Sequence, residues 1–328
     1  MTTRNVAGMS SSRRLHGRKP DYAPGRYFPD GSETHMEGTA TCTATTLSAD
    51  ADLALLQRII DDAKRGRLRL PSLPDLAQKV RTVVNDPRRS VAEIARVVQF
   101  DPALAARLIQ VANSPLYRGS KRFDNCHSAI TRMGLVAARN LLVGFSMRNL
   151  FAARTPLLSD RLHQTWQHSC RVAAISSVLA RLTPGLDADR ALLAGLVHDI
   201  GVLPLLQYIE TMGMEMDPGR LDRLIERARV ALGVFVLKAW QFEADLADIP
   251  SQVEDWKRDS GPRIDYGDIV QVAHAHSLFG HGGYAGPPLP ELTAFRKLTI
   301  SQLGPGCSLE LLQQSQQEIS EVVGILQG

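Results

Sequence analysis

The sequence predicts an all-α protein. Apolar residues recur at three- and four-residue spacing from about Asp50 to the C-terminus, which is the period of an amphipathic helix. Alanine, leucine and arginine dominate the composition and aromatic residues make up only 5% of it, which favours helices. No segment alternates apolar and polar residues as a half-buried strand does. With 328 residues, the chain can form one large domain or two modest ones.

The N-terminal residues 1–48 predict a disordered tail, because they are rich in Gly, Ser, Thr, Pro and Arg without a hydrophobic period. They contain no apolar core of a secretory signal. No fully apolar run approaches the roughly 20 residues of a membrane helix. We therefore expect a cytoplasmic protein without membrane contact. Its four cysteines form no CxxC pair, which favours free thiols in a reducing compartment.

Several local signals set helix boundaries in the first half. Ser48 can cap a helix that starts near Asp50, and Asn85-Asp86-Pro87 ends the helix that begins at Asp75. Ser90 and Glu93 form a capping-box pattern. Asp101-Pro102 then starts a further helix.

The two helices after Ser90 and Asp101 resemble a helix-turn-helix unit. In a DNA-binding unit of this kind, Arg107 could face a phosphate. Ala105, Ala106, Leu108 and Ile109 leave little polar surface to read bases, so a simple helical hairpin is favoured. DNA binding stays open as an alternative.

The second half predicts helices over residues 161–182, 188–206, 220–240 and 266–279. His198 and Asp199 lie side by side in the second of these, within an apolar stretch. Burying such groups without partners costs roughly 2–7 kcal/mol, so they must be hydrogen-bonded, metal-bound or strained. His168 lies on the inner stripe of the preceding helix and is the nearest further ligand candidate.

Charge is distributed unevenly along the chain. Residues 64–154 are strongly basic, whereas acidic residues outnumber basic ones between Asp160 and Asp268. This asymmetry fits contact with nucleic acid or an acidic partner, and it fits equally well one half of the chain docking on the other.

Many dispersed motifs resemble the HDOD family, the HD-related output domains of bacterial signalling proteins. The resemblance covers roughly residues 68–279. The positions that carry it are Leu70-Pro71, Leu73-Pro74, Asn85-Asp86-Pro87, Asp101-Pro102-Ala103-Leu104, Arg107-Leu108, Ala112-Asn113-Ser114, Ala129-Ile130, Met133-Gly134-Leu135, Arg139-Asn140-Leu141, Trp166, His168 and the stretch from Gly195 to Gly201.

The resemblance implies a two-lobed helical protein. Its N-terminal helical lobe would span residues 49–157 and would pack on a degenerate HD-like lobe spanning residues 158–288. Residues 289–328 would form a linker and a C-terminal helix, which we expect to dock on the core rather than pair with a second chain.

In HD phosphohydrolases, the order His168, then His198-Asp199, would begin a metal-binding set. Here Arg229 stands where the resemblance expects a later histidine ligand, and His274 stands in place of the final aspartate. The segment expected to supply a paired histidine offers Glu254 and Asp255 at best. A guanidinium repels a divalent cation by roughly 8 kcal/mol at 4 Å and an effective dielectric near 20.

We therefore expect His168, His198, Asp199, Arg229 and His274 to form a vestigial HD site without a metal or other cofactor, held by hydrogen bonds. The alternative is a reduced site in which His168, His198, Asp199 and His274 hold Mn or Fe. His276 and His281 are expected on the surface.

By resemblance, the chain is a non-catalytic bacterial signal-transduction module that binds a signalling protein partner or a small nucleotide ligand. The alternative within the superfamily is a metal-dependent phosphohydrolase or cyclic-nucleotide phosphodiesterase. The alternative from the basic half is a DNA-binding regulator through Arg107.

Overall fold

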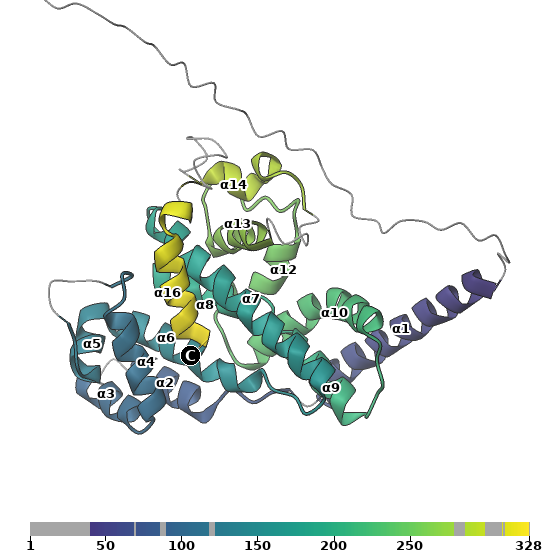
Figure 1. Ribbon diagram of the computed structural model, residues 1–328, viewed down its shortest axis with the longest axis horizontal. Helices are drawn as coiled ribbons and strands as arrows, with labels where there is room; N and C mark the ends of the chain where they lie inside the picture. The colour runs from purple at the N-terminus through teal and green to yellow at the C-terminus, as the bar shows by residue number, and fades with distance from the viewer. Residues whose placement is uncertain are drawn as a thin grey trace, which may run out of the picture. The chain divides into compact units, whose positions relative to one another are not determined.

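The computed structural model describes residues 40–68, 70–85, 90–117, 122–278, 286–298, 310 and 312–327. Every regular element in these ranges is a helix, which confirms the all-α prediction (Figure 1). Residues from Ser48 onward form one compact unit. The division into two lobes stays a prediction, and residues 1–39 of the expected tail lie outside the described residues.

The first helix is longer than predicted. The helix α1, Ala40–Lys64, is already helical at Ala40, so Ser48 lies inside it and does not cap it. The segment before Asp50 contains no glycine or proline that would stop a helix. Farther along, Asp52 is buried and pairs with Arg220 and Arg223 of a later helix, at 2.7 and 3.8 Å.

Five helices and one short 3-10 turn follow. They are α2 (Asp75–Asn85), α3 (Val91–Gln99), α4 (Pro102–Ala112), α5 (Cys126–Met133), α6 (Leu135–Met147) and η1 (Arg148–Leu150).

The predicted boundaries of these helices are confirmed where sequence signals were strong. Ser90 and Glu93 form the capping box of α3, and the Asp101 carboxylate caps α4 by accepting hydrogen bonds from two backbone N–H groups. Gly134 separates α5 from α6 with φ at 89°, a conformation that favours glycine. Asn113 closes the loop after α4 through two hydrogen bonds with the backbone of Phe123.

The second half consists of longer helices followed by short ones. They are α7 (Pro156–Arg181), α8 (Ala188–Val197), α9 (Val202–Thr211), α10 (Pro218–Ala239), α11 (Ala244–Ala247), α12 (Ile249–Glu254), α13 (Tyr266–Leu278), η2 (Leu289–Glu291), α14 (Thr293–Lys297) and α16 (Gln316–Gln327).

Helix α7 is central to this half, because it contacts α8, α9, α13 and α16 (Figure 1). Its closest approach is to α8 at Gly195. A Cβ atom on Gly195 would lie 2.5 Å from the Cα atom of Ala173 in α7, so only glycine permits this spacing. The two helices therefore meet backbone to backbone.

The predicted single helix over residues 188–206 is wrong, because the helix breaks at the His-Asp pair. Helix α8 ends at Val197, and turns lead to Val202, the first residue of α9. The backbone N–H of Ile200 donates to the carbonyl of Val197 and that of Val202 to the carbonyl of Asp199, which is the tighter three-residue pattern. Averaged over its length, Ala188–Thr211 is apolar enough to span a membrane, yet 94% of the residues in its most apolar window are buried within the protein.

The C-terminal region confirms one prediction and corrects another. The expected linker contains η2 and α14, whose Leu289 and Phe295 are buried, because this segment carries apolar residues and α14 packs against α13. Helix α16 docks on α7 and α4 and buries Ile319 and Val322, as predicted.

Replacing Gly195 with alanine should lower the free energy of unfolding by about 1–3 kcal/mol, because the added methyl group overlaps the α7 backbone. Urea titration of both proteins measures this difference. The control is Gly324→Ala in α16, where a Cβ atom meets no heavy atom within 4 Å. That variant should be unchanged or more stable by about 0.5–1 kcal/mol. Equal effects of the two substitutions would show that α7 and α8 are not in backbone contact.

Asp189, in the first turn of α8, should make stability depend on pH. Burial raises the pKa of this carboxyl to about 7, so its contribution to stability is present below the ordinary pKa of 3.8 and is lost as pH rises through 7. Asp189→Asn should therefore exceed the wild type in free energy of unfolding by up to about 4 kcal/mol above pH 7 and converge with it near pH 4. Asp160→Asn, an exposed change in α7, serves as the control. A difference that does not vary with pH would contradict this assignment.

Candidate functional site

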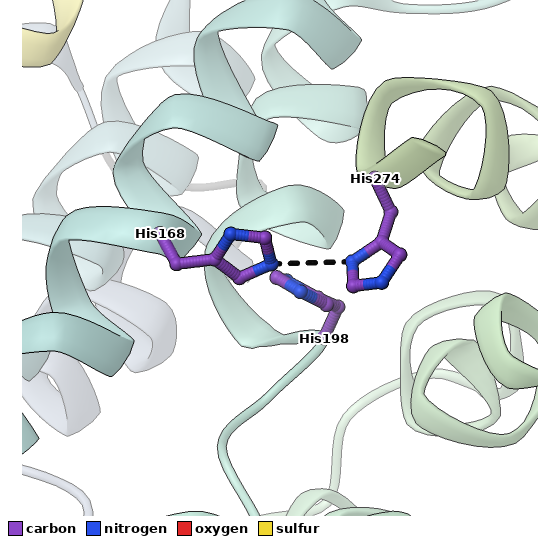
Figure 2. A group of neighbouring side chains, drawn as sticks. All are labelled: His168, His198 and His274. Carbon is purple, nitrogen blue, oxygen red and sulfur yellow. Dashed lines mark hydrogen bonds between the residues drawn. The ribbon is translucent and has the colours of Figure 1, made fainter. Parts of the chain in front are cut away.

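Three histidines from separate segments meet beside the break between α8 and α9. His168 comes from α7, His198 from the turn after α8, and His274 from α13. Their ring centroids are 5.0–5.3 Å apart, and one nitrogen atom of each lies within 4.8 Å of the others. Figure 2 shows the three rings directed toward one another, with Nε2 of His168 at 3.2 Å from Nδ1 of His274.

A hydrogen bond to the backbone fixes the orientation of the His198 ring. Nδ1 of His198 lies 2.7 Å from the carbonyl oxygen of Gly195, and a carbonyl can only accept a hydrogen bond. This nitrogen therefore carries a proton, and Nε2 lies on the side of Asp199. On α13, the hydroxyl of Ser277 donates to the carbonyl oxygen of His274, and Trp256 lies against the His274 ring at a centroid distance of 6.0 Å.

A buried ion-pair network lies directly beside the histidines. The guanidinium of Arg229, from α10, pairs with the carboxylate of Asp199 through Nη1 and with Glu254 of α12 through Nη2, the latter at 2.7 Å. The second carboxylate oxygen of Asp199 lies 3.4 Å from Nε2 of His198 and 4.0 Å from Nε2 of His168. Arg229 thus connects α10, the His-Asp turn and α12.

Gly201 brings α10 close enough for this contact. A Cβ atom on Gly201 would lie 1.9 Å from the carbonyl oxygen of Arg229 and 2.4 Å from the backbone nitrogen of Gly233. No other residue fits between the turn and the helix. The glycine therefore sets the distance between the Arg229 side chain and Asp199.

The pKa values indicate neutral imidazoles at His168 and His274, with charged groups beside them. Burial, with the neighbouring His198, lowers the pKa of His168 to about 4 and that of His274 well below its usual value. Burial alone would raise the pKa of Asp199, but the charges of His198 and Arg229 outweigh it and hold the pKa below the ordinary range. Burial likewise opposes the charge on Arg229, whereas Asp199 and Glu254 raise its pKa.

The structure brings together all five residues predicted for the vestigial HD site: His168, His198, Asp199, Arg229 and His274. Glu254 joins them, whereas the Asp255 carboxylate accepts a hydrogen bond from the backbone of Lys257. Sequence analysis placed Arg229 next to the site but did not predict its ion pairs. The available signal was an arginine in a predicted helix at a position where the family resemblance expects a ligand directed into the site.

The other histidines and Arg107 lie elsewhere. His276 is only 8% exposed, so its prediction as a surface residue is wrong, because α13 packs against α7, α8, α12 and α14 and is buried on all sides at this position. His281 lies outside the described residues. Arg107 is partly buried on α4, and burial together with Arg148 lowers its pKa. Its contact with a DNA phosphate stays a prediction.

The residues present fit the divalent metal of an HD centre poorly. The imidazoles of His168 and His274, whose pKa values are lowered, can donate lone pairs to an ion. The carboxylate that would join them is already held by a permanent cation, and the same guanidinium would repel the metal. The arrangement as it stands is a histidine cluster, with a hydrogen bond between His168 and His274, next to two carboxylates that share one guanidinium.

Comparison with known proteins gives consistent matches. The HDOD domain family profile matches residues 70–255. An uncharacterized protein of Treponema pallidum (strain Nichols) is 26% identical over 253 residues, which are 75% of this chain and 45% of that protein. The chain thus spans less than half the length of this curated relative.

Solved structures share the fold. A Shewanella amazonensis SB2B protein, provisionally assigned as a metal-dependent phosphohydrolase, is 27% identical with a TM-score of 0.73, covering 84% of this chain and 99% of its own. An HDOD domain protein of unknown function from Geobacter sulfurreducens is 20% identical with a TM-score of 0.59, covering 85% of this chain and 98% of its own.

Replacing Arg229 with methionine should lower the free energy of unfolding by about 3–5 kcal/mol, because two partly buried carboxylates lose their partner. Chemical denaturation at neutral pH measures the loss. Arg227→Met, an exposed change on the same helix, is the control and should shift stability by no more than about 0.5 kcal/mol.

Adding Asp199→Asn and Glu254→Gln to the Arg229→Met protein should recover most of the lost stability, since no unpaired charge remains. If the Arg229 and Arg227 variants were equally stable, the ion-pair network would not support the fold.

Proposed function

Because the chain belongs to the HDOD family, we propose that it is a non-catalytic bacterial signalling module of the cytoplasm, in which Arg229 takes the place of a metal ion. Its HD-type centre then has a structural role, and the protein acts by binding a signalling partner or a small ligand. The observation that carries this proposal is the guanidinium of Arg229, paired at once with Asp199 and Glu254.

The energetics support a permanently closed centre. Arginine cannot lose its proton to make way for a cation. A metal ion at this point requires Arg229 to leave, which gives up two ion pairs whose groups are at most 24% exposed. Breaking a buried pair by removing one partner costs about 3–5 kcal/mol. The bonds that the metal forms with the histidines and the released carboxylates would have to recover that cost.

A second candidate function, a phosphohydrolase with a reduced metal site, is favoured by two observations. The three histidines offer converging nitrogen atoms, and one guanidinium faces two carboxylates, so these side chains together retain a negative charge. The Shewanella protein provisionally assigned as a metal-dependent phosphohydrolase shares 27% identity with the chain. Histidine ligands suit zinc, iron or manganese at such a site.

Metal analysis of the purified protein separates the two candidates. We expect far less than one ion per chain after equilibration with manganese or ferrous iron, and no hydrolysis of bis(p-nitrophenyl) phosphate. Replacing Arg229 with histidine frees Asp199 and adds a donor, so metal content should rise toward one ion per chain. Arg227→His is the control, because its side chain is exposed. Stoichiometric metal in the wild type, with turnover abolished by Asp199→Ala, would establish the second candidate and overturn the first.

A further inference from the structure

The C-terminal helix α16 is held on the protein by apolar contacts and one ion pair. It docks on α7 and α4 and buries Ile319, Val322, Ile325 and Leu326. Among the described residues, a single ion pair or hydrogen bond of α16 side chains reaches another element, and it joins Glu318 to Arg181 of α7. The remaining side-chain hydrogen bonds of the helix connect its own residues.

Two grooves lie beside α16. One, of about 570 Å³, is formed by α16 with α7 and α13, and the other, of about 590 Å³, by α16 with the end of α4 and Phe123. Gly324 lines both grooves, and a Cβ atom at this position would meet no heavy atom within 4 Å. Closely packed protein interiors contain few voids larger than a water molecule. The helix therefore does not fill the surface on which it lies.

The preceding helix α14 is attached in a different way. The ammonium group of Lys297 donates to the hydroxyl of Ser260 at 2.7 Å and lies 3.3 Å from the carboxylate of Asp268, which is buried. Arg258 pairs with the same carboxylate at 2.8 Å. Removing one partner from such a buried network is costly. The release of α16 requires only that its apolar face and one partly exposed ion pair separate from α7 and α4.

We propose that α7 and α4 form a docking surface for an amphipathic helix of a signalling partner, and that α16 occupies this surface until the partner helix replaces it. The inference rests on the proposed function for the existence of such a partner. Helices that bind in grooves place apolar side chains at positions i, i+3, i+4 and i+7. The residues of α16 at these positions are Ile319, Val322, Val323 and Leu326.

The contacts of α16 define the chemistry of the partner helix. Glu318 comes directly before the apolar pattern and pairs with Arg181, so the partner helix should carry a carboxylate at the same position. A large apolar residue at the position of Gly324 would also enter the space beside α16, which adds favourable contact.

This additional contact favours a different protein over a second copy of the chain. A helix on the same chain competes at an effective concentration of about 1 mM. The α16 helix of a second copy would make the same contacts as the tethered helix and gain no advantage over it. A partner helix that fills the space at Gly324 gains contacts that α16 lacks.

Fluorescence anisotropy with a labelled synthetic peptide of residues 308–328 tests the inference on the full chain. Ile319→Asp together with Val322→Asp places two charges in the apolar face of the tethered α16 and leaves α7 and α4 unchanged. This double variant should bind the peptide at one site per chain, roughly ten- to hundredfold more tightly than the wild type, in which α16 competes. Gln314→Asp with Gln317→Asp adds the same charge at exposed positions and should bind the peptide as weakly as the wild type.

A charge exchange identifies the contact that the peptide makes. Adding Arg181→Glu to the double variant should weaken binding of the peptide roughly three- to tenfold, because two carboxylates then face each other. A peptide carrying Glu318→Arg should restore the affinity for this triple variant and bind the double variant more weakly.

Peptides changed at Gly324 test whether another helix can outcompete α16. A peptide carrying Gly324→Leu should bind the double variant roughly three- to tenfold more tightly than a peptide carrying Gly324→Ala. The alanine peptide is the control, because it gains helix propensity without the larger side chain.

Five outcomes would overturn the inference. Loss of the cooperative unfolding transition in the double variant would show that the fold requires a docked α16. The absence of saturable peptide binding at ~1 mM, or affinities unaffected by the charge exchange, would exclude the surface on α7. Equal affinities of the Gly324→Leu and Gly324→Ala peptides, or a wild-type dimer that exchanges α16 between copies, would exclude a different protein as the occupant.

The proposed function and this inference fail separately. A metal-free, inactive protein whose double variant does not bind the peptide would refute the docking surface alone and leave the proposed function standing. Stoichiometric metal with turnover would overturn the proposed function, whereas the affinity of the peptide is measured independently of metal content.

Discussion

The ion pairs of Arg229 with Asp199 and Glu254 are the constraint on which the HD-type centre depends. They join α10, the turn after α8 and α12, three segments that are not adjacent in the sequence. Isolated surface ion pairs contribute little, but these groups are at most 24% exposed and each partner would be costly to bury alone. The same guanidinium keeps Asp199 ionised next to the neutral imidazoles of His168 and His274.

Close backbone contacts make that interaction geometrically available. Gly201 allows the turn to lie against the backbone of α10, and Gly195 allows α8 to lie against α7. On α10, Gly233 faces Pro250 of α12, where a Cβ atom would come within 3.0 Å of the proline ring. Each contact excludes a side chain from the space between two elements. The polar cluster is therefore surrounded by tightly packed backbone, which restricts the room in which Arg229 could move aside.

Features set by neighbouring residues could be predicted from the sequence, and features set by distant segments could not. The capping box of Ser90 and the helix start at Asp101-Pro102 are local, and both are confirmed. The helix ends at Val197, and the turn that follows brings Gly201 against the backbone of α10. The periodicity of apolar residues does not reveal this contact with a distant helix. His276 is buried because α13 is enclosed by helices from distant parts of the chain, α7, α8, α12 and α14.

The candidate site shows the same division. His168, His198, Asp199 and His274 were predicted to form one centre because their order resembles that of a known family, and the structure brings them together.

Sequence reasoning gave Arg229 only a repulsive effect on a metal, because a charge was considered without its partners. The structure adds that its charge is attractive toward two carboxylates. In the proposed function, a cation supplied by the protein itself takes the place of a divalent ion between the two acids, and the three groups keep a net negative charge. The hydrogen bond between His168 and His274 connects α7 and α13, two helices that also line the groove beside α16. A change in the spacing of α7 and α13 would alter both the groove and the histidine cluster, since the imidazoles of His168 and His274 are hydrogen-bonded to each other from these two helices.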